Sequence, residues 1–397
     1  MPPVTGYSRG SGASGRRPGG ALLLLNSLTV GGSETKVVAI ANALYRAGTP
    51  VHIAYLNGPD CLRARLDPAI PVIPLHRQGK FSPSAVMRLA KYAAAHGIGR
   101  IVAVNLHPLV YAHLAARIVA TKPAVVALVN TTIHRSARDR AFMRIYAPLL
   151  RRSTRVVFGS ESQAATWVRA YRLSPDRCVS VFNGIDTDHF APGGDSACAQ
   201  AVRRELGFRT DDFVLGTVGA MRPEKGHADL ITAACEMRRR GLTVRVLLVG
   251  DGPCRRELER YARQRGVAEV TRFVGPSEDV RPFLSAMDAF VLPSVAVETF
   301  SNAALEAMAM ARPVVLTDIG GAREMVVDGA SGLIYPAGDV EALIRSLHAL
   351  ESDATYRDCL GRAARARVCE RFSFKRMLRD YEQWVFDHRD IPAMAIS

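Results

Sequence analysis

Residues 291 to 326 read VLPSVAVETFSNAALEAMAMARPVVLTDIGGAREMV. The opening VLPS predicts a buried strand that ends in a turn. An apolar helical segment leads from it to a second strand, VVLT, and then to Gly320-Gly321 and another helix. Short apolar runs that alternate with helical patterns are typical of a parallel sheet covered by helices on both faces. The stretch therefore predicts an α/β fold.

Two glutamates, Glu298 and Glu306, lie just past the first of these strands, where parallel sheets bind ligands. If Thr299 or Ser301 caps the helix, its N-terminus offers unpaired N–H groups to an anion such as a diphosphate. Eight helical residues span about 12 Å, whereas the two carboxylates of a retaining glycosidase lie about 5 to 5.5 Å apart. The spacing instead suits a long ligand with hydroxyl groups at both ends and phosphate between them, as in a nucleotide sugar. An isolated pair of this spacing is more often a loop residue and a helix residue facing solvent, so the neighbouring motifs decide.

The same alternation runs through the chain and divides it into two similar halves. Strand candidates are ALLLL, VHIAYL, PVIPL, IVAVN, AVVALVN and RVVFGS in the first half, and FVLGTVG, VRVLLVG, VTRFVG, DAFVLPS and RPVVLTD in the second. The small and polar APGGDSACA marks a break near residues 184 to 200. We expect a disordered basic tail at 1 to 19 and Rossmann-like domains at 20 to 185 and 186 to 374. A C-terminal helix at about 375 to 392 is expected to cross back to the first domain.

Composition narrows the class of protein. A chain of 397 residues that is 48% hydrophobic can form two cores. No run of eighteen apolar residues occurs, and ALLLL is too short for the core of a signal peptide, so we expect neither a membrane span nor a secretion signal. Seven cysteines, an odd number without a C-x-x-C pair, are typical of a reducing cytoplasm and not of a disulfide framework or a zinc site. We therefore expect a cytoplasmic protein.

Positive charge is concentrated in the first half. Residues 1 to 190 carry 24 Lys and Arg against 8 Asp and Glu, a net charge of +16, whereas residues 191 to 397 carry 28 against 29, a net charge of −1. Much of the excess lies in HRSARDRAFMRIYAPLLRRSTR, residues 134 to 155. This pattern indicates either a helix attracted to an anionic membrane surface or an ordinary amphipathic helix with a solvated basic face. We do not expect nucleic acid as a partner, because no recognition motif or set of stacking aromatic residues accompanies the charge.

An ordered series of short motifs resembles one enzyme family, the retaining glycosyltransferases of family 4. The motifs are GGSE at 31 to 34, FNGID at 182 to 186, VGAMRPEKG at 218 to 226, LLVGDGP at 247 to 253, FVG at 273 to 275, ETFSNAALEAMA at 298 to 309 and TDIGGAREMV at 317 to 326. Each motif is weak alone, but the ordered set is specific. The resemblance covers about residues 20 to 390. It implies the GT-B fold, in which two Rossmann-like domains face a central cleft.

The resemblance also implies roles for particular residues. Lys225 resembles the lysine that pairs with the donor diphosphate, Glu306 the carboxylate that holds the ribose, and Glu298 the one that holds the transferred hexose. Gly31 and Gly32 resemble the glycine loop of the first domain, which lets the backbone approach sugar and diphosphate. The remaining expected donor contacts come from the FVG motif and the start of the helix: Phe273, Phe300, Ser301 and Asn302.

Two departures from the family pattern concern catalysis. Many members have an arginine directly after the glycine of the VG…KG loop, where this chain has Ala220, and we expect Arg222 to take its place. The usual histidine of the acceptor cleft falls at Asn130, which can donate a hydrogen bond but cannot act as an acid. We therefore nominate His134, four residues on, with His107 as a second candidate, although a lone histidine near a strand end is more often structural.

These features predict a retaining hexosyltransferase. It would move a hexose or N-acetylhexosamine from a nucleotide diphosphate sugar, UDP in preference to GDP, to a lipid-linked or cell-surface glycan, with peripheral contact at the inner face of the membrane. The resemblance implies front-side displacement without a metal, and the D-x-D at residues 186 to 188 belongs to the FNGID segment. Ala220 and Asn130 leave open a degenerate member that serves as a scaffold or regulatory subunit. A sugar-nucleotide epimerase or a phosphorylase on the same architecture is a further alternative.

Overall fold

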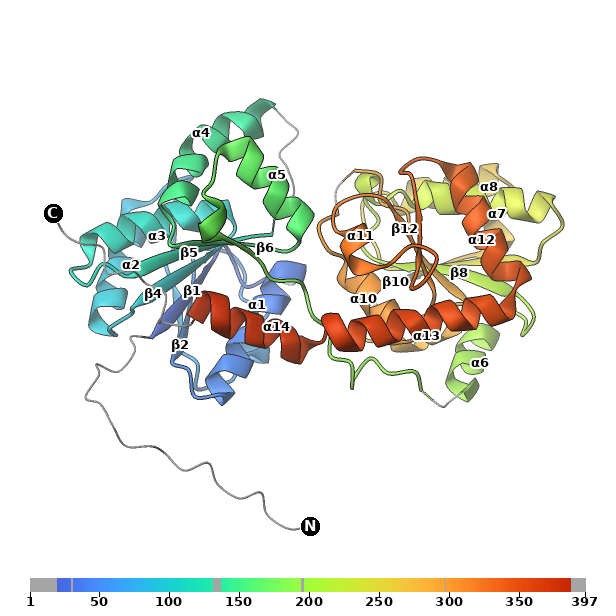
Figure 1. The fold of residues 1–397 in the computed structure, drawn as a ribbon, viewed down its shortest axis with the longest axis horizontal. Coiled ribbons are helices and arrows are strands. Elements are labelled where there is room, and N and C mark those ends of the chain that lie inside the picture. The colour runs from blue at the N-terminus through green and yellow to red at the C-terminus, as the bar shows by residue number, and fades with distance from the viewer. Residues whose placement is uncertain (1–19, 30, 131–136, 194–195, 297, 387–397) are drawn as a thin grey trace, which may run out of the picture.

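We describe residues 20–29, 31–130, 137–193, 196–296 and 298–386 of a computed structural model. Within these residues the chain forms two parallel β-sheets, one in each of two domains that lie side by side (Figure 1). Helices cover both faces of each sheet. The α/β class and the two Rossmann-like domains are confirmed.

The first sheet has the strand order β3-β2-β1-β4-β5-β6-β7, and all of its pairings are parallel. Its strands are β1 (Ala21–Leu25), β2 (Val51–Tyr55), β3 (Val72–Pro74), β4 (Arg100–Val104), β5 (Ala124–Val129), β6 (Arg155–Phe158) and β7 (Cys178–Ser180). β1 and β4 are neighbours although β2 and β3 separate them along the chain. Their carboxyl ends therefore form the switch point at which such sheets bind ligands.

Two layers of helix enclose this sheet. The helices of the first domain are α1 (Gly32–Arg46), α2 (Pro83–Ala95), α3 (Leu106–Ile118), α4 (Ala137–Arg152) and α5 (Glu161–Tyr171). One face of the sheet packs on α1, and the opposite face packs on α2, α3, α4 and α5. Because both faces are buried, the strands are nearly continuous apolar runs, which is why the sequence revealed the longer ones.

The second sheet repeats this plan with the order β10-β9-β8-β11-β12-β13. Its strands are β8 (Phe213–Val218), β9 (Val244–Val249), β10 (Thr271–Gly275), β11 (Ala289–Leu292), β12 (Val314–Thr317) and β13 (Leu333–Tyr335). The helices are α6 (Ser196–Glu205), α7 (His227–Arg239), α8 (Arg255–Gln264), α9 (Arg281–Ala286), α10 (Asn302–Ala309), α11 (Ala322–Met325), α12 (Val340–Ser352) and α13 (Ala354–Arg371). The switch point here lies between β8 and β11.

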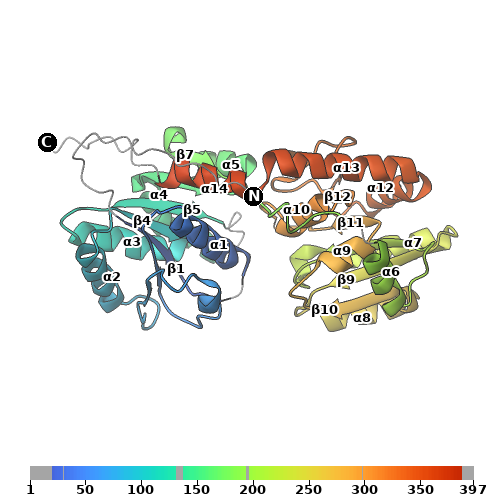
Figure 2. The same ribbon diagram turned by 90° about the horizontal axis from the view of Figure 1, so that it is seen from below.

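The chain crosses between the domains twice, and the two crossings are bonded together. The backbone N–H of Ile185 donates to the carbonyl of Phe372 at 2.9 Å, and that of Phe374 donates to the carbonyl of Ile185 at 2.8 Å. After the second crossing α14 (Phe374–Tyr381) continues the line of α13 onto the first domain (Figures 1 and 2), where Met377 and Tyr381 join the core beneath α1. The predicted return of a C-terminal helix to the first domain is confirmed. Residues 387 to 392 of that predicted helix lie outside the described ranges.

Candidate functional site

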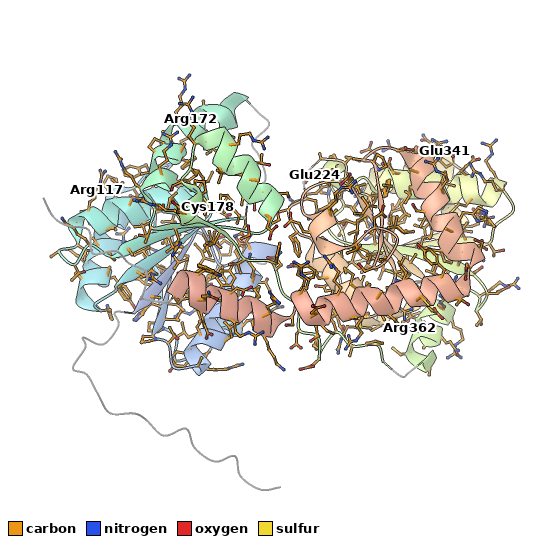
Figure 3. The ribbon with its side chains drawn as sticks, viewed as in Figure 1. Arg117, Arg172, Cys178, Glu224, Glu341 and Arg362 are labelled. Atoms are coloured by element: carbon orange, nitrogen blue, oxygen red, sulfur yellow. The ribbon has the colours of Figure 1, made fainter. Side chains whose placement is uncertain are left out.

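The loop that follows β8 is locked against the end of β11. Gly226 has a φ of +64°, and a Cβ there would lie 2.0 Å from the carbonyl oxygen of Pro293. The N–H of Val295 donates to the carbonyl of Glu224 at 2.9 Å, which ties the same two loops together. Glu224 lies on the side of the second domain that faces the first (Figure 3). Only glycine combines the left-handed conformation with this close approach, so the glycine of the Lys-Gly pair is a packing requirement.

Lys225 and Glu298, predicted separately as donor contacts, form an ion pair. Lys225 Nζ lies 2.6 Å from Glu298 Oε2, and Ser294 Oγ donates to the same oxygen at 3.2 Å. The side chains are 27% and 13% exposed, respectively. The ammonium is therefore held beside the Glu298 carboxylate while part of its side chain stays exposed to solvent.

Helix α10 presents its N-terminus beside this pair. Ser301 is its N-cap, and its hydroxyl accepts from the N–H of Ala304 at 3.3 Å. The earlier N–H groups of a first helical turn have no partner within the helix and attract anions. Two glycines hold the preceding loop in place: a Cβ at Gly320 would lie 1.9 Å from the Glu298 carbonyl oxygen, and one at Gly321 would lie 2.7 Å from the Phe300 ring.

Glu306 lies one and a half turns into α10 and is largely buried. Its carboxylate forms no hydrogen bond or ion pair with any residue that the structure describes, and burial raises its pKa to about 7. A carboxylate that lacks a partner in a buried position is suited to accept hydrogen bonds from ligand hydroxyl groups. This position agrees with the expected ribose contact, which stays a prediction.

The other expected donor residues differ in placement. Arg222 is exposed at the N-cap of the 3₁₀ turn that carries Lys225, and Asn302 begins α10. Phe300 is buried, with its ring centroid 5.1 Å from that of Phe182, so only its backbone is available to a ligand. Phe273 lies in the edge strand β10, three strands from β11, or roughly 14 Å at the usual spacing. Its ring packs against the core, and its role is untested.

A cavity joins the two domains next to Glu298. Its volume is about 380 Å³, at the lower end of the size of small-molecule sites. It is lined by the start of α5 in the first domain and by the donor loops of the second: Ser160, Ser162, Gln163, Thr166, Trp167, Ala296, Glu298, Thr299, Ile319 and Gly320. The contribution of α5 was not predicted. A Gly-Ser pair at the end of strand β6 was the signal in the sequence that could have indicated it.

A carboxylate of the second domain contacts the start of α5, whose Ser162 lines this cavity. Glu324 accepts hydrogen bonds from the backbone N–H groups of Glu161 at 2.6 Å and Ser162 at 2.9 Å, which form the N-terminus of α5. The hydroxyl of Ser162 donates to the carbonyl of Gly320 at 2.9 Å. A negative charge at a helix N-terminus is favourable, so this contact holds α5 against the donor loops.

In the first domain the predicted glycine loop occupies the switch point. Gly31 is the N-cap of α1, and a Cβ there would lie 2.6 Å from the carboxylate of Glu34, whereas a Cβ at Gly32 would meet nothing within 4 Å. His134, the nominated histidine, lies outside the described residues. His107 is half-buried and stacks on Tyr111 with a centroid distance of 5.5 Å, and its pKa is lowered, chiefly by burial. No group of three or more metal-ligating side chains gathers within the described ranges.

Two family models match the chain. The model of Glycosyltransferase Family 4 matches residues 30–189, and the model of Glycosyl transferases group 1 matches residues 212–353. The chain belongs to glycosyltransferase family 4. The two matches lie on the two Rossmann-like domains in turn, and the second contains the Lys225–Glu298 pair and Glu306.

Curated relatives of this family member are similar over part of their length. The D-inositol 3-phosphate glycosyltransferase of Kribbella flavida is 35% identical over 223 residues, which is 53% of this chain and 51% of the relative. The GDP-mannose-dependent alpha-(1-6)-phosphatidylinositol monomannoside mannosyltransferase of Mycolicibacterium smegmatis is 32% identical over 236 residues, which is 55% of this chain and 60% of the relative. The aligned part of the chain thus spans between half and three-fifths of these two relatives.

Solved structures of similar shape confirm the GT-B fold of this family 4 chain. HepE from Anabaena, determined in complex with UDP, has a TM-score of 0.82 at 22% identity, over 92% of this chain and 98% of that one. WaaG, a glycosyltransferase involved in lipopolysaccharide biosynthesis, has a TM-score of 0.71 at 17% identity, over 92% of this chain and 100% of that one. At these identities the likeness concerns the fold alone.

Proposed function

We propose that this protein is a retaining glycosyltransferase that takes a hexose or N-acetylhexosamine from a nucleotide diphosphate sugar, UDP in preference to GDP. The observation that carries the proposal is the 2.6 Å pair of Lys225 and Glu298 beside the N-terminus of α10, with unpartnered Glu306 farther along the same helix. Glu298, the cation beside the helix terminus, and Glu306 follow the order of hexose, diphosphate and ribose. Intact donor groups favour an active enzyme over a scaffold.

In the proposed reaction the acceptor oxygen bonds to the anomeric carbon on the same face from which the bond to the diphosphate breaks. The acceptor's proton passes to the departing phosphate oxygen. Lys225 and Arg222 stabilise the negative charge that develops on the leaving group. The proposed reaction includes no divalent cation. In the D-x-D sequence, Asp186 Oδ1 accepts from the backbone N–H groups of Asp188 and His189, each at 3.0 Å, as a local turn.

The acceptor is proposed to carry phosphate and to be lipid-linked or part of a cell-surface glycan. The net charge of +16 over residues 1 to 190 supports an anionic acceptor, since the first domain forms one side of the cavity. The names of the two relatives, one acting on D-inositol 3-phosphate and one on a phosphatidylinositol mannoside, agree with a phosphate-bearing acceptor.

The test of donor use begins with calorimetric titration of UDP and GDP, followed by turnover of the sugar nucleotides of the base that binds. Lys225→Ala is expected to lower kcat about 10²- to 10³-fold, the usual cost of one lost charge-stabilising group. Lys91→Ala, a change at an exposed lysine of α2, is the matched control and is expected to leave kcat unchanged. Binding without turnover of any sugar nucleotide would favour the scaffold or regulatory alternative.

A second proposal concerns contact with a membrane through α4. In the described part of the chain, no helix combines the length and apolar character needed to cross a bilayer. On α4, however, Phe142 is 44% exposed and Ile145 57% exposed, and Arg152 lies on the same face. An apolar face flanked by arginines is suited to lie in an anionic interface.

Flotation with vesicles tests this contact. Wild type is expected to float with phosphatidylglycerol vesicles at low salt, to bind less as salt rises, and to ignore phosphatidylcholine vesicles. Replacement of both Phe142 and Ile145 by serine is expected to lower recruitment at least several-fold. Equal recovery with both lipids, or none with either, would contradict membrane contact through this face.

A further inference from the structure

Lys36 lies on α1 where the two domains meet. Its Nζ donates to Asn130 Oδ1 at 2.8 Å, at the end of β5, and to Asn183 Oδ1 at 3.1 Å, in the segment that joins the domains. Asn183 in turn donates from Nδ2 to the carbonyl of Phe300 at 2.9 Å, one residue before the cap of α10. A short polar chain thus connects the first helix of the first domain to the donor end of the second.

The charge of Lys36 is uncompensated. Both of its partners are neutral amides, and within the described ranges no carboxylate forms an ion pair with it. The segment directly after Asn130, residues 131 to 136, reads TTIHRS and contains no acidic residue. Burial lowers the pKa of Lys36 to about 8. Burying an ammonium without a counter-charge costs free energy. A negatively charged ligand beside Lys36 would offset this cost.

Other hydrogen-bond donors without a partner among the described residues lie at the same end of the first sheet as the Lys36 ammonium. Asn130 Nδ2 is buried and has no hydrogen-bond partner among the described residues. Helix α1 begins without a side-chain cap, and beside it the space at Gly32 is open. A helix N-terminus, an amide N–H₂ group and an ammonium are all groups that bind an anion. Their common location is the switch point of the first sheet.

We propose that Lys36 binds the diphosphate of the donor from the first-domain side, opposite Lys225. This inference rests on the proposed use of a nucleotide diphosphate sugar. A phosphate of the acceptor has the same chemistry, but the donor is favoured because the polar chain from Lys36 ends at Phe300, beside the N-terminus of α10. The bound diphosphate supplies the missing counter-charge, and it therefore draws the two domains together.

The decisive variant is Asn130→Asp, which keeps the shape of the side chain and its bond to Lys36 but supplies the missing carboxylate. It is expected to weaken binding of UDP or GDP, whichever wild type binds, at least tenfold, while the free nucleoside is bound as before. Thermal stability should be equal to or above that of wild type, because the buried charge is then paired. A purely structural role for Lys36 predicts the same stability result but unchanged nucleotide binding.

Lys36→Met provides the second test, with Lys91→Met on exposed α2 as the matched control. The first change is expected to lower diphosphate affinity and kcat at least tenfold without loss of melting temperature, and the control to change neither.

Inorganic pyrophosphate serves as a probe that needs no base recognition. If wild type binds nucleotide and both Lys36→Met and Asn130→Asp bind it equally well, the role of Lys36 is overturned and the proposed function stands. If only pyrophosphate binds, and both variants weaken it, the anion site stands and the nucleotide donor does not. Binding of neither overturns both.

Discussion

The two domains have the same strand order around their switch points. They differ in which buried ionisable group, a cation or an acid, lacks a partner of opposite charge among the described residues. In the second domain Lys225 is paired with Glu298 at 2.6 Å, and Glu306 has no hydrogen-bond or ion-pair partner in the part of the chain that the structure describes. In the first domain Lys36 donates hydrogen bonds to two asparagine amides and forms no ion pair with any described residue. The first domain therefore presents a lone cation and the second a lone acid. A ligand with phosphate at one point and hydroxyl groups at another can bind both Lys36 and Glu306. These two side chains do not pair with each other.

The loops at the two switch points also differ in freedom. After β8 the backbone is interlocked, because Gly226 touches Pro293 and Gly320 touches Glu298 at distances that only glycine permits. After β1 nothing approaches the Cβ position of Gly32 within 4 Å. The second domain has its donor groups fixed in advance, which lowers the entropy cost of binding. The first domain leaves room for the ligand to enter.

The largest expected effect is that of Gly226→Ala, which is compared with the matched substitution Gly32→Ala in the open loop. Gly226→Ala forces a left-handed residue with a Cβ into the carbonyl of Pro293 and is expected to cost about 2 kcal/mol or more in unfolding free energy. It also displaces Lys225, and a displacement of about 1 Å can cost about 10²-fold in rate. Thermal unfolding and kcat at saturating donor measure the two effects.

Gly32→Ala is the counterpart in the open loop. Its methyl group meets no atom, and alanine is the better helix former, so stability is expected to stay the same or to rise by up to about 1 kcal/mol. If the donor binds at this loop as proposed, the methyl group enters its space, and KM for the donor is expected to rise. A loss of stability at Gly32 equal to that at Gly226 would show that the two loops are equally constrained, contrary to the geometry.

The sequence predicted the longer strands and β3, and it missed β7 and β13. β7 and β13 have three residues each and lie at the same edge of the two sheets. Neither has the longer apolar run that PVIPL supplies around β3, which is an equally short edge strand. The remaining strands are longer or end in a recognisable turn, and the sequence placed each of them in order.

The site was predictable where its residues are close in sequence and not where distant segments meet. Lys225, Glu298 and Glu306 lie in motifs whose residues follow a strand directly. Lys36 is different, because its proposed role depends on its hydrogen bonds to Asn130 and Asn183, which are 94 and 147 residues away in the sequence. Single-chain patterns carry no information on such contacts, and a lysine in the first turns of a helix has many ordinary explanations.

The last expected effect is confined to part of the pH range and concerns Glu306. The pKa of Glu306 is raised by burial from 4.5 to about 7, so the folded protein holds this proton over that range. Stability from the neutral group is full below about pH 4.5 and is lost as pH rises through about 7. Glu306→Gln removes the dependence. The variant should match wild type at pH 5 and be more stable by about 1 to 3 kcal/mol at pH 8, a value reduced for partial exposure.

Melting curves of wild type and Glu306→Gln from pH 5 to pH 8 measure this difference, and parallel curves would contradict it. Lys36 should give the opposite slope at higher pH, because its lowered pKa makes stability rise as pH increases from about 8 to 10.5. Repeating the melting curves with saturating UDP or GDP distinguishes an effect of burial alone from a role of Glu306 in binding the ribose. Hydroxyl groups that donate to Glu306 stabilise its ionised form and lower its pKa. The pH dependence that Glu306 confers should therefore shrink in the complex, and it should persist if the ribose lies elsewhere.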